Sequence, residues 1–206
     1  MSDFYLASHS ARRVDLLRQV GARFETLLLR SALPRGPDVG ESRHGDEAPL
    51  DYVTRIANEK AAQGVQALFA RGMLRKPVLS ADTIVVVDGA IFTKPKDAAE
   101  AAEFLVRLSG RAHEVLTAVA LALPGSGTPT LWARLSRSTV TLRAIAADEA
   151  ARYATTGEPF DKAGGYAIQG RAAVFVERLE GSYSGVVGLP LAETAALLAR
   201  AGIRLV

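Results

Sequence analysis

One apolar run in the middle of the chain constrains the fold more than any other feature. From Val78 to Val87 the sequence reads VLSADTIVVV, which is rich in β-branched residues and predicts a strand buried in a sheet. Asp88-Gly89 follows this run and precedes a second apolar stretch, a pattern typical of a two-residue hairpin turn. In a regular hairpin we expect three opposed pairs: Val87 with Ala90, Val85 with Phe92, and Thr83 with Lys94.

Helical and strand-like patterns alternate in the first half of the chain, and hairpin patterns dominate the second half. This order predicts an α/β fold with a mixed, twisted sheet and flanking helices. The expected helices are a segment capped by Ser10 and ended by Gly21, Leu50–Ala70, a segment capped by Asp97, Asp148–Thr155 and Leu191–Ala201. The other expected strands are Phe4–Ser8, an antiparallel pair over His113–Leu123 and Arg134–Arg143, and a hairpin within Tyr166–Gly181.

Composition excludes several classes of protein. The chain has 206 residues, of which 49% are hydrophobic and 23% charged, so we expect one domain spanning 1–206 rather than a disordered chain. No apolar run is long enough for a transmembrane helix and the start does not resemble a signal peptide. The absence of cysteine removes disulfides and thiol chemistry and is compatible with a cytoplasmic location.

The net charge of +3 is small for a protein that binds nucleic acid through a basic face. A modest preference for anionic small molecules and an ordinary solubility charge both explain it. We therefore expect neither a stable nucleic-acid partner nor a membrane partner.

The first candidate site is SHSARR, from Ser8 to Arg13. A strand that turns into a helix here would present free backbone N–H groups, and Arg12 and Arg13 would add donors for phosphate oxygens. Positively charged side chains are unfavourable at this end of a helix unless an anion binds beside them. The alternative is a solvated helix start whose arginines pair with acids such as Asp15.

The second candidate is the end of the predicted hairpin at which Asp82 and Lys94 would lie side by side. Because the pleat points the two side chains to opposite faces, they converge only if the strand bends there. A carboxylate beside a lysine can hold a metal ion and a phosphate, and it can equally be a surface ion pair.

The third candidate is GEPFDKAGGYAIQG, whose glycines permit close backbone approach or positive φ. Gln169 within it carries both a donor and an acceptor, as a residue that reads a base edge requires. Dense glycines also make ordinary turns. Elsewhere, Pro34–Pro49 has the length of a functional loop, and the chain lacks the GxSxG, HExxH, GxxxxGK[ST] and GxGxxG motifs.

Taken in order, five segments of the chain resemble the Maf family of nucleoside triphosphate pyrophosphatases. They are LASHSARRVDLL, YVTRIANEKA, SADTIVVVDG, KPKDAAEAAEFLVRLSGRAHEVLTAV and GEPFDKAGGYAIQGRAAVFVERLEGSYSGVVGLPLAET, and they run from residue 6 to about residue 194. The resemblance implies two lobes around a central cleft, as in Maf and ITPase-like folds. It also implies hydrolysis between the α- and β-phosphates. DKAGGYAIQG resembles the branch acting on dTTP and UTP.

The resemblance also implies a role for individual residues. Asp82 matches the proton-accepting aspartate, and Glu41 the acidic residue of the loop, although Asp46-Glu47 competes for that match. The matched substrate-binding positions are Ser8, Arg12, Arg13, Lys60, Thr83, Lys94 and Gln169, of which Arg13, Thr83 and Gln169 are associated with substrate choice. Ala11 stands where the family usually has proline.

For cofactors and partners, the resemblance implies a divalent cation, Mg²⁺ or alternatively Mn²⁺, held by Asp82 and Glu41. It implies a homodimer that removes unwanted nucleotides, including modified pyrimidine triphosphates, and the family name carries a link to septum formation and cell division. Two alternatives stay open. One is the same chemistry with a preference for purine nucleotides or 7-methyl-GTP, and the other is a regulator that binds nucleic acid or protein without catalysis.

Overall fold

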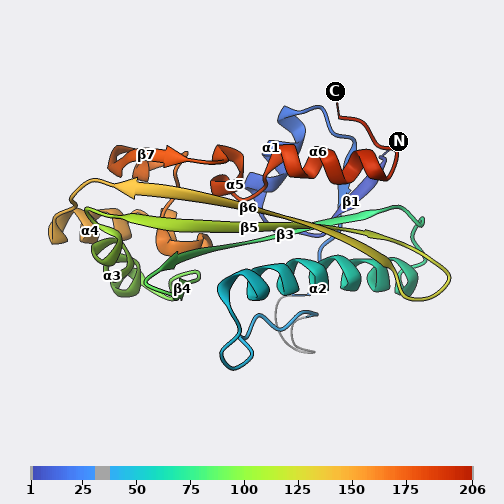
Figure 1. Ribbon diagram of the computed structural model, residues 1–206, viewed down its shortest axis with the longest axis horizontal. Coiled ribbons are helices and arrows are strands. Elements are labelled where there is room, and N and C mark those ends of the chain that lie inside the picture. Colours follow the sequence, from blue (N-terminus) through green and yellow to red (C-terminus); the bar gives the residue numbers. More distant parts are fainter. Residues whose placement is uncertain (1, 31–37, 206) are drawn as a thin grey trace. The chain divides into compact units, whose positions relative to one another are not determined.

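The computed structural model describes residues 2–30 and 38–205. The strands of this part are β1 (Phe4–Leu6), β2 (Phe24–Thr26), β3 (Val78–Val87), β4 (Ala90–Phe92), β5 (Ala112–Leu123), β6 (Thr130–Leu142) and β7 (Val176–Glu180). The helices are α1 (Ala11–Gln19), α2 (Pro49–Ala70), α3 (Ala98–Leu108), α4 (Ala147–Ala154), α5 (Tyr183–Val187) and α6 (Leu191–Arg200), with 3₁₀ turns η1 (Glu158–Asp161), η2 (Ala163–Gly165) and η3 (Arg171–Phe175). The mixed α/β class is confirmed (Figure 1).

All seven strands join one sheet in the order β2-β1-β3-β5-β6-β7, with β4 paired to β3. The chain forms two compact units. Unit 1 contains Met1–Asp82, Thr117–Leu135 and Gly188–Val206, and unit 2 contains Thr83–Leu116 and Ser136–Val187.

In unit 1, β1 pairs in parallel with both β2 and β3. Helix α2 covers one side of these strands, and α1 and α6 lie on the other side (Figure 1). Helix α2 approaches closely because Gly64 has no side chain: a Cβ there would lie 2.5 Å from Cγ1 of Val78. The Ser80 hydroxyl also donates a hydrogen bond of 2.6 Å to the carbonyl of Ala57, which ties β3 to α2.

In unit 2, β3 and β4 form the predicted hairpin. Asp88 and Gly89 both have positive φ, 50° and 73°, as the favoured two-residue turn requires. The pairs Val85–Phe92 and Val87–Ala90 are confirmed. Strand β4 ends at Phe92, so the predicted pairing of Thr83 with Lys94 lies beyond its end.

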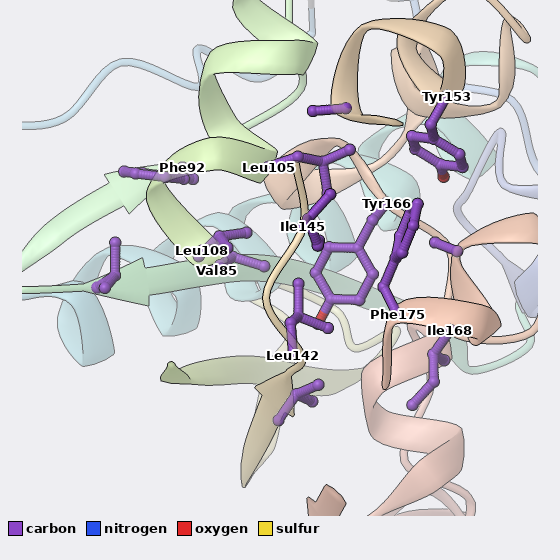
Figure 2. Packing of buried hydrophobic residues seen from close by; sticks show 14 of the residues in the cluster. Val85, Phe92, Leu105, Leu108, Leu142, Ile145, Tyr153, Tyr166, Ile168 and Phe175 are labelled. Atoms are coloured by element: carbon purple, nitrogen blue, oxygen red, sulfur yellow. The ribbon is translucent and has the colours of Figure 1, made fainter. Parts of the chain in front are cut away.

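The core of unit 2 gathers side chains from the hairpin, α3, α4 and the η2–η3 segment (Figure 2). The rings of Tyr153 and Phe175 meet edge to face there, with centroids 5.7 Å apart. Helix α3 begins as predicted, with the Asp97 side chain accepting a hydrogen bond of 2.9 Å from the amide of Glu100.

Two local predictions are wrong. The segment Tyr166–Gly181 does not form a hairpin; it contains η3 and then the single strand β7, which pairs antiparallel with β6. Ser10 occupies the N-cap position of α1, but its side chain makes no capping hydrogen bond. Strand β2 was not expected from the sequence.

Part of the predicted loop Pro34–Pro49, residues 34–37, lies outside the described residues. Across the residues that are described, no helix combines the length and the apolar character needed to cross a bilayer.

Candidate functional site

Lys60 stands between two carboxylates of unit 1. Its Nζ lies 2.8 Å from Oδ1 of Asp82 and 2.6 Å from Oε1 of Glu41. The Lys60 and Asp82 side chains are 18% and 14% exposed, whereas Glu41 is 53% exposed. The inner ion pair is therefore largely shielded from water, and Glu41 closes it on the solvent side.

The local structure explains why Lys60 meets Asp82. Side chains two apart on a strand share a face, and so do side chains three apart on a helix. Ser80 on β3 already bonds to Ala57 on α2, so Asp82 and Lys60 are the next residues on the two facing surfaces. Asp82 and Thr83 are also the only residues of β3 that are not fully buried.

The start of α1 forms a second group of polar contacts. The Ser8 hydroxyl accepts hydrogen bonds from the amide of Ser10 at 3.1 Å and from Nη1 of Arg13 at 3.2 Å. Nε of Arg13 donates to the carbonyl of Gly188 at 2.8 Å. Asp15, the acid considered as a partner for these arginines, pairs with Arg18 at 3.6 Å.

Electrostatics link the two groups. Burial lowers the pKa of the Arg13 guanidinium; the charge of Asp82 opposes this, Arg12 adds to it, and Glu41 opposes it. The Arg13 guanidinium therefore lies in the electrostatic field of Asp82 and Glu41, the two carboxylates that pair with Lys60. A cationic rim beside a shielded carboxylate is an arrangement that can bind phosphate oxygens and accept a proton.

The structure distinguishes the competing acids of the loop. Glu41 contacts Lys60, whereas Glu47 forms a bidentate ion pair with Arg55 of α2. Nε and Nη2 of Arg55 donate to Oε1 and Oε2 of Glu47 at 2.7 and 2.8 Å. The hydrogen bonds from Arg55 overcome the effect of burial and lower the pKa of Glu47 to about 2. Asp46 is exposed. Glu41 is thus the loop acid that lies against the Lys60–Asp82 pair.

Two residues of α2 that the sequence did not single out hold this loop. The Tyr52 hydroxyl donates to the carbonyl of Glu41 at 2.8 Å, and Nη2 of Arg55 donates to the carbonyl of Ser42 at 3.0 Å. Both lie on the same predicted helix as Lys60, and this is the sequence feature that could have suggested them. The groups they bind are backbone carbonyls, which every residue type has, so the sequence does not identify these contacts.

The carboxylates fit a hard divalent cation. Glu41 and Asp82 supply oxygen donors that converge on one cationic nitrogen, and Mg²⁺ is commonly held by one or two carboxylates together with substrate phosphates. Within the described ranges there is no cluster of three or more metal-ligating side chains. A pair of carboxylates suits a cation that also binds phosphate oxygens.

The remaining candidates belong to unit 2. Thr83 directly follows Asp82 and is partly exposed, while Lys94 and Gln169 are exposed. The Asp82 partner in the structure is Lys60 on α2, a different element from the Lys94 segment considered from the sequence.

The sequence also matches known proteins over nearly its whole length. A family model described as Maf-like protein matches residues 3–201. A Nitrosomonas europaea protein named dTTP/UTP pyrophosphatase is 52% identical over 97% of this chain and 94% of its own. Proteins of the same name from Nitrosospira multiformis and Burkholderia pseudomallei are 52% and 51% identical, over 98% and 97% of this chain and 95% and 93% of their own.

A solved structure, that of the Staphylococcus aureus Ham1 protein, is a more distant match at 15% identity. It has a TM-score of 0.39 and covers 67% of this chain and 71% of that chain. The family match spans nearly the whole sequence described above, including the segments that carry Ser8, Lys60 and Asp82. The chain belongs to the Maf family.

Proposed function

We propose that this protein hydrolyses nucleoside triphosphates, with dTTP and UTP preferred, to the nucleoside monophosphate and pyrophosphate. The single observation that carries the proposal is the shielded Lys60–Asp82 pair with Glu41 on its solvent side. Relatives at about half identity named dTTP/UTP pyrophosphatase support the substrate class.

In the proposed reaction, water attacks the α-phosphorus and the bond from that phosphorus to the bridging oxygen breaks. The new P–O bond remains in the monophosphate, and the bridging oxygen leaves with pyrophosphate. Asp82 accepts the proton of the attacking water. Arg12, Arg13, Lys60 and Lys94 stabilise the negative charge that grows on the phosphate oxygens and on the leaving group.

A bound Mg²⁺, or Mn²⁺, would neutralise phosphate charge and lower the pKa of a bound water. Asp82 and Glu41 are the residues that would hold it. In the absence of substrate, the Lys60 ammonium group balances the negative charge of the two carboxylates and keeps them close together.

For base selection the proposal assigns Thr83 and Gln169. A side-chain amide and a hydroxyl can match the edge of a pyrimidine, and a wrong base would leave those groups without partners. We further propose that modified pyrimidine triphosphates are substrates, and that the enzyme works as a cytoplasmic homodimer.

The experiment is a panel of triphosphates assayed for pyrophosphate and monophosphate, with Mg²⁺, with Mn²⁺ and with EDTA. We expect the largest kcat/KM with dTTP and UTP and none with EDTA. A preference for purine nucleotides or 7-methyl-GTP would overturn the assigned specificity. No turnover of any nucleotide, with salt-sensitive binding of RNA or DNA, would favour the regulatory alternative.

The Asp82→Asn variant tests the proton acceptor. It is expected to bind dTTP and to lose turnover by about 10²-fold or more, the usual contribution of a general base. Normal turnover by a variant that binds dTTP would remove Asp82 from this role.

A further inference from the structure

Gln169 stands on a tight turn of unit 2 whose backbone is fixed. The amide of Gly170 donates to the carbonyl of Ala167 at 3.0 Å, which closes a four-residue turn. Ile168 and Tyr166 point into the core of unit 2 (Figure 2), whereas Gln169 itself is exposed. The turn therefore presents one polar side chain from an otherwise buried segment.

A single carboxylate and a single hydroxyl hold both sides of this turn. Oε2 of Glu158 accepts from the amide of Arg171 at 3.0 Å, and Oε1 accepts from the amide of Ala172 at 3.3 Å. Oε1 also accepts from the Tyr153 hydroxyl at 2.7 Å. The same hydroxyl oxygen accepts from the amide of Ala167, on the other side of the turn, at 3.3 Å.

Charge and burial fix the direction of these bonds. Burial alone would raise the pKa of Glu158, but the amide of Arg171, the Tyr153 hydroxyl and the amide of Ala172 together hold it below its usual value. Burial and the neighbouring Glu158 raise the pKa of Tyr153. Glu158 therefore stays an acceptor and Tyr153 stays protonated over the whole physiological range of pH.

Gly170 makes room for this network. Its φ is −107°, an ordinary value for any residue, so a positive φ is not the reason for glycine here. A Cβ at this position would lie 2.5 Å from Oε2 of Glu158 and 2.6 Å from its Oε1. Any side chain at residue 170 would push the carboxylate away from the amides that it binds.

We propose that Glu158 and Tyr153 are positioning residues that set the nucleotide-base preference by fixing the turn that carries Gln169. The inference rests on the proposed function, because it assigns base reading to Gln169. Neither Glu158 nor Tyr153 needs to contact the nucleotide. They act by removing the backbone freedom that Gln169 would otherwise lose on binding, which is a cost to affinity.

The test uses Tyr153→Phe, which keeps the ring against Phe175, and Glu158→Gln, which replaces one of the two acceptor oxygens by a donor. Hydrogen exchange of the peptide spanning 166–173 is measured first, without nucleotide. Both variants should exchange faster there than the parent protein. Asp148→Asn is the matched control on α4, because its exposed pair with Arg152 does not touch the turn.

Steady-state kinetics provide the second measurement. Each variant should raise KM for dTTP by about fivefold, the effect of losing one net hydrogen bond, and should narrow the preference for dTTP over CTP. We expect kcat to stay within about twofold, because the phosphate-binding residues are unchanged. Asp148→Asn is measured in the same assay. Partial unfolding of a variant would lower its apparent kcat, which distinguishes it from the expected change in KM.

A double variant separates this inference from the proposed function. In a Gln169→Ala background, Tyr153→Phe should change neither KM nor selectivity further, because its effect passes through Gln169. An equal effect with and without Gln169, or unchanged exchange of the turn, would overturn the positioning role while leaving the enzyme assignment intact. A parent protein inactive on every nucleotide would instead overturn the proposed function, and the inference with it.

Discussion

Lys60 and Asp82 form an ion pair of 2.8 Å between α2 and β3, with both side chains less than one-fifth exposed. Each charge would be costly at this depth without the other, because water is largely replaced by protein around them. Glu41 adds a second acceptor for the same ammonium group. The pair thus joins the two elements and holds the carboxylate at the point where the proposed chemistry needs it.

Replacing Lys60 by Met is expected to destabilise the protein by about 1–3 kcal/mol, because Asp82 and Glu41 would then repel each other without a shared cation. Urea unfolding measures this change. The double variant Lys60→Met/Asp82→Asn should lose less than the sum of the two single variants. Strict additivity would show that the pair contributes nothing as a pair.

Replacing Arg55 by Met is expected to release the segment that carries Glu41. Arg55 holds Glu47 and the Ser42 carbonyl, so its loss should speed hydrogen exchange in residues 40–47 and raise the Mg²⁺ concentration needed for half-maximal activity. Arg18→Met, which removes an exposed partner of Asp15, serves as control. An unchanged Mg²⁺ requirement would mean that the Arg55 contacts do not position Glu41.

The Arg55–Glu47 pair should persist well below neutral pH. The pKa of Glu47 is lowered to about 2 in the folded protein from an ordinary value of 4.5. The pair therefore contributes its full stabilisation above about pH 4.5 and loses it as the pH falls toward 2. A ¹³C titration of the Glu47 carboxyl group tests this, and a midpoint near 4.5 would contradict the pairing.

His113 should make stability depend on pH in a window higher than that of Glu47. It is 3% exposed, and burial together with the charge of Arg111 lowers its pKa from 6.5 to about 4. Its neutral form is therefore favoured on folding, so stability is full above pH 6.5 and falls by roughly 3 kcal/mol toward pH 4.

Urea unfolding at pH 7.5 and 4.5 measures this effect in the parent protein and in His113→Gln. The variant should show a smaller loss of stability between the two pH values. His9→Gln, which alters an exposed histidine hydrogen-bonded to the Leu29 carbonyl, should keep the parental loss. An equal loss in parent and His113→Gln would exclude His113 as the cause.

Gly64→Ala is expected to destabilise the protein by about 1–3 kcal/mol, because the added methyl group overlaps Val78 at the α2–β3 contact. Helix propensity alone would favour alanine by about 1 kcal/mol, so the sign of the change decides which effect dominates. Gly127→Ala is the control, since nothing lies within 4 Å of a Cβ there. A more stable Gly64→Ala protein would show that α2 can move away freely.

Local patterns predicted the elements that depend on neighbouring residues. The Asp88-Gly89 turn was predictable because these residue types favour the two-residue turn, and both adopt the positive φ that it requires. The helix near Leu50–Ala70 was predictable from its apolar stripe. The helix beginning after Asp97 followed from a side chain that caps a nearby amide. Each of these depends on contacts within about four residues, which a sequence displays directly.

The elements that were missed depend on distant partners. Residues 166–181 have hairpin-like alternation, but Glu158 binds the amides of Arg171 and Ala172, which removes them from strand pairing and leaves a 3₁₀ turn. The spacing of residues 166–181 does not reveal this partner. The Ser10 cap failed for a different reason, because Ser10 occupies the N-cap position but its side chain makes no capping hydrogen bond.

The candidate site was predicted residue by residue only through resemblance to a family. The residues alone suggested Ser8, Arg13 and Asp82, each with an ordinary structural alternative. The convergence of Glu41 and Asp82 on Lys60 required the packing of α2 on β3. The supporting contacts of Tyr52 and Arg55 end on backbone carbonyls, and any residue type supplies those.

The hydrogen bonds around residue 169 end on the main chain of Ala167, Arg171 and Ala172, so the frame does not depend on which side chain it displays. Mutation can exchange that side chain at little cost to folding. If Gln169 reads the base as proposed, a single codon change would alter nucleotide preference while Glu158 and Tyr153 stay the same.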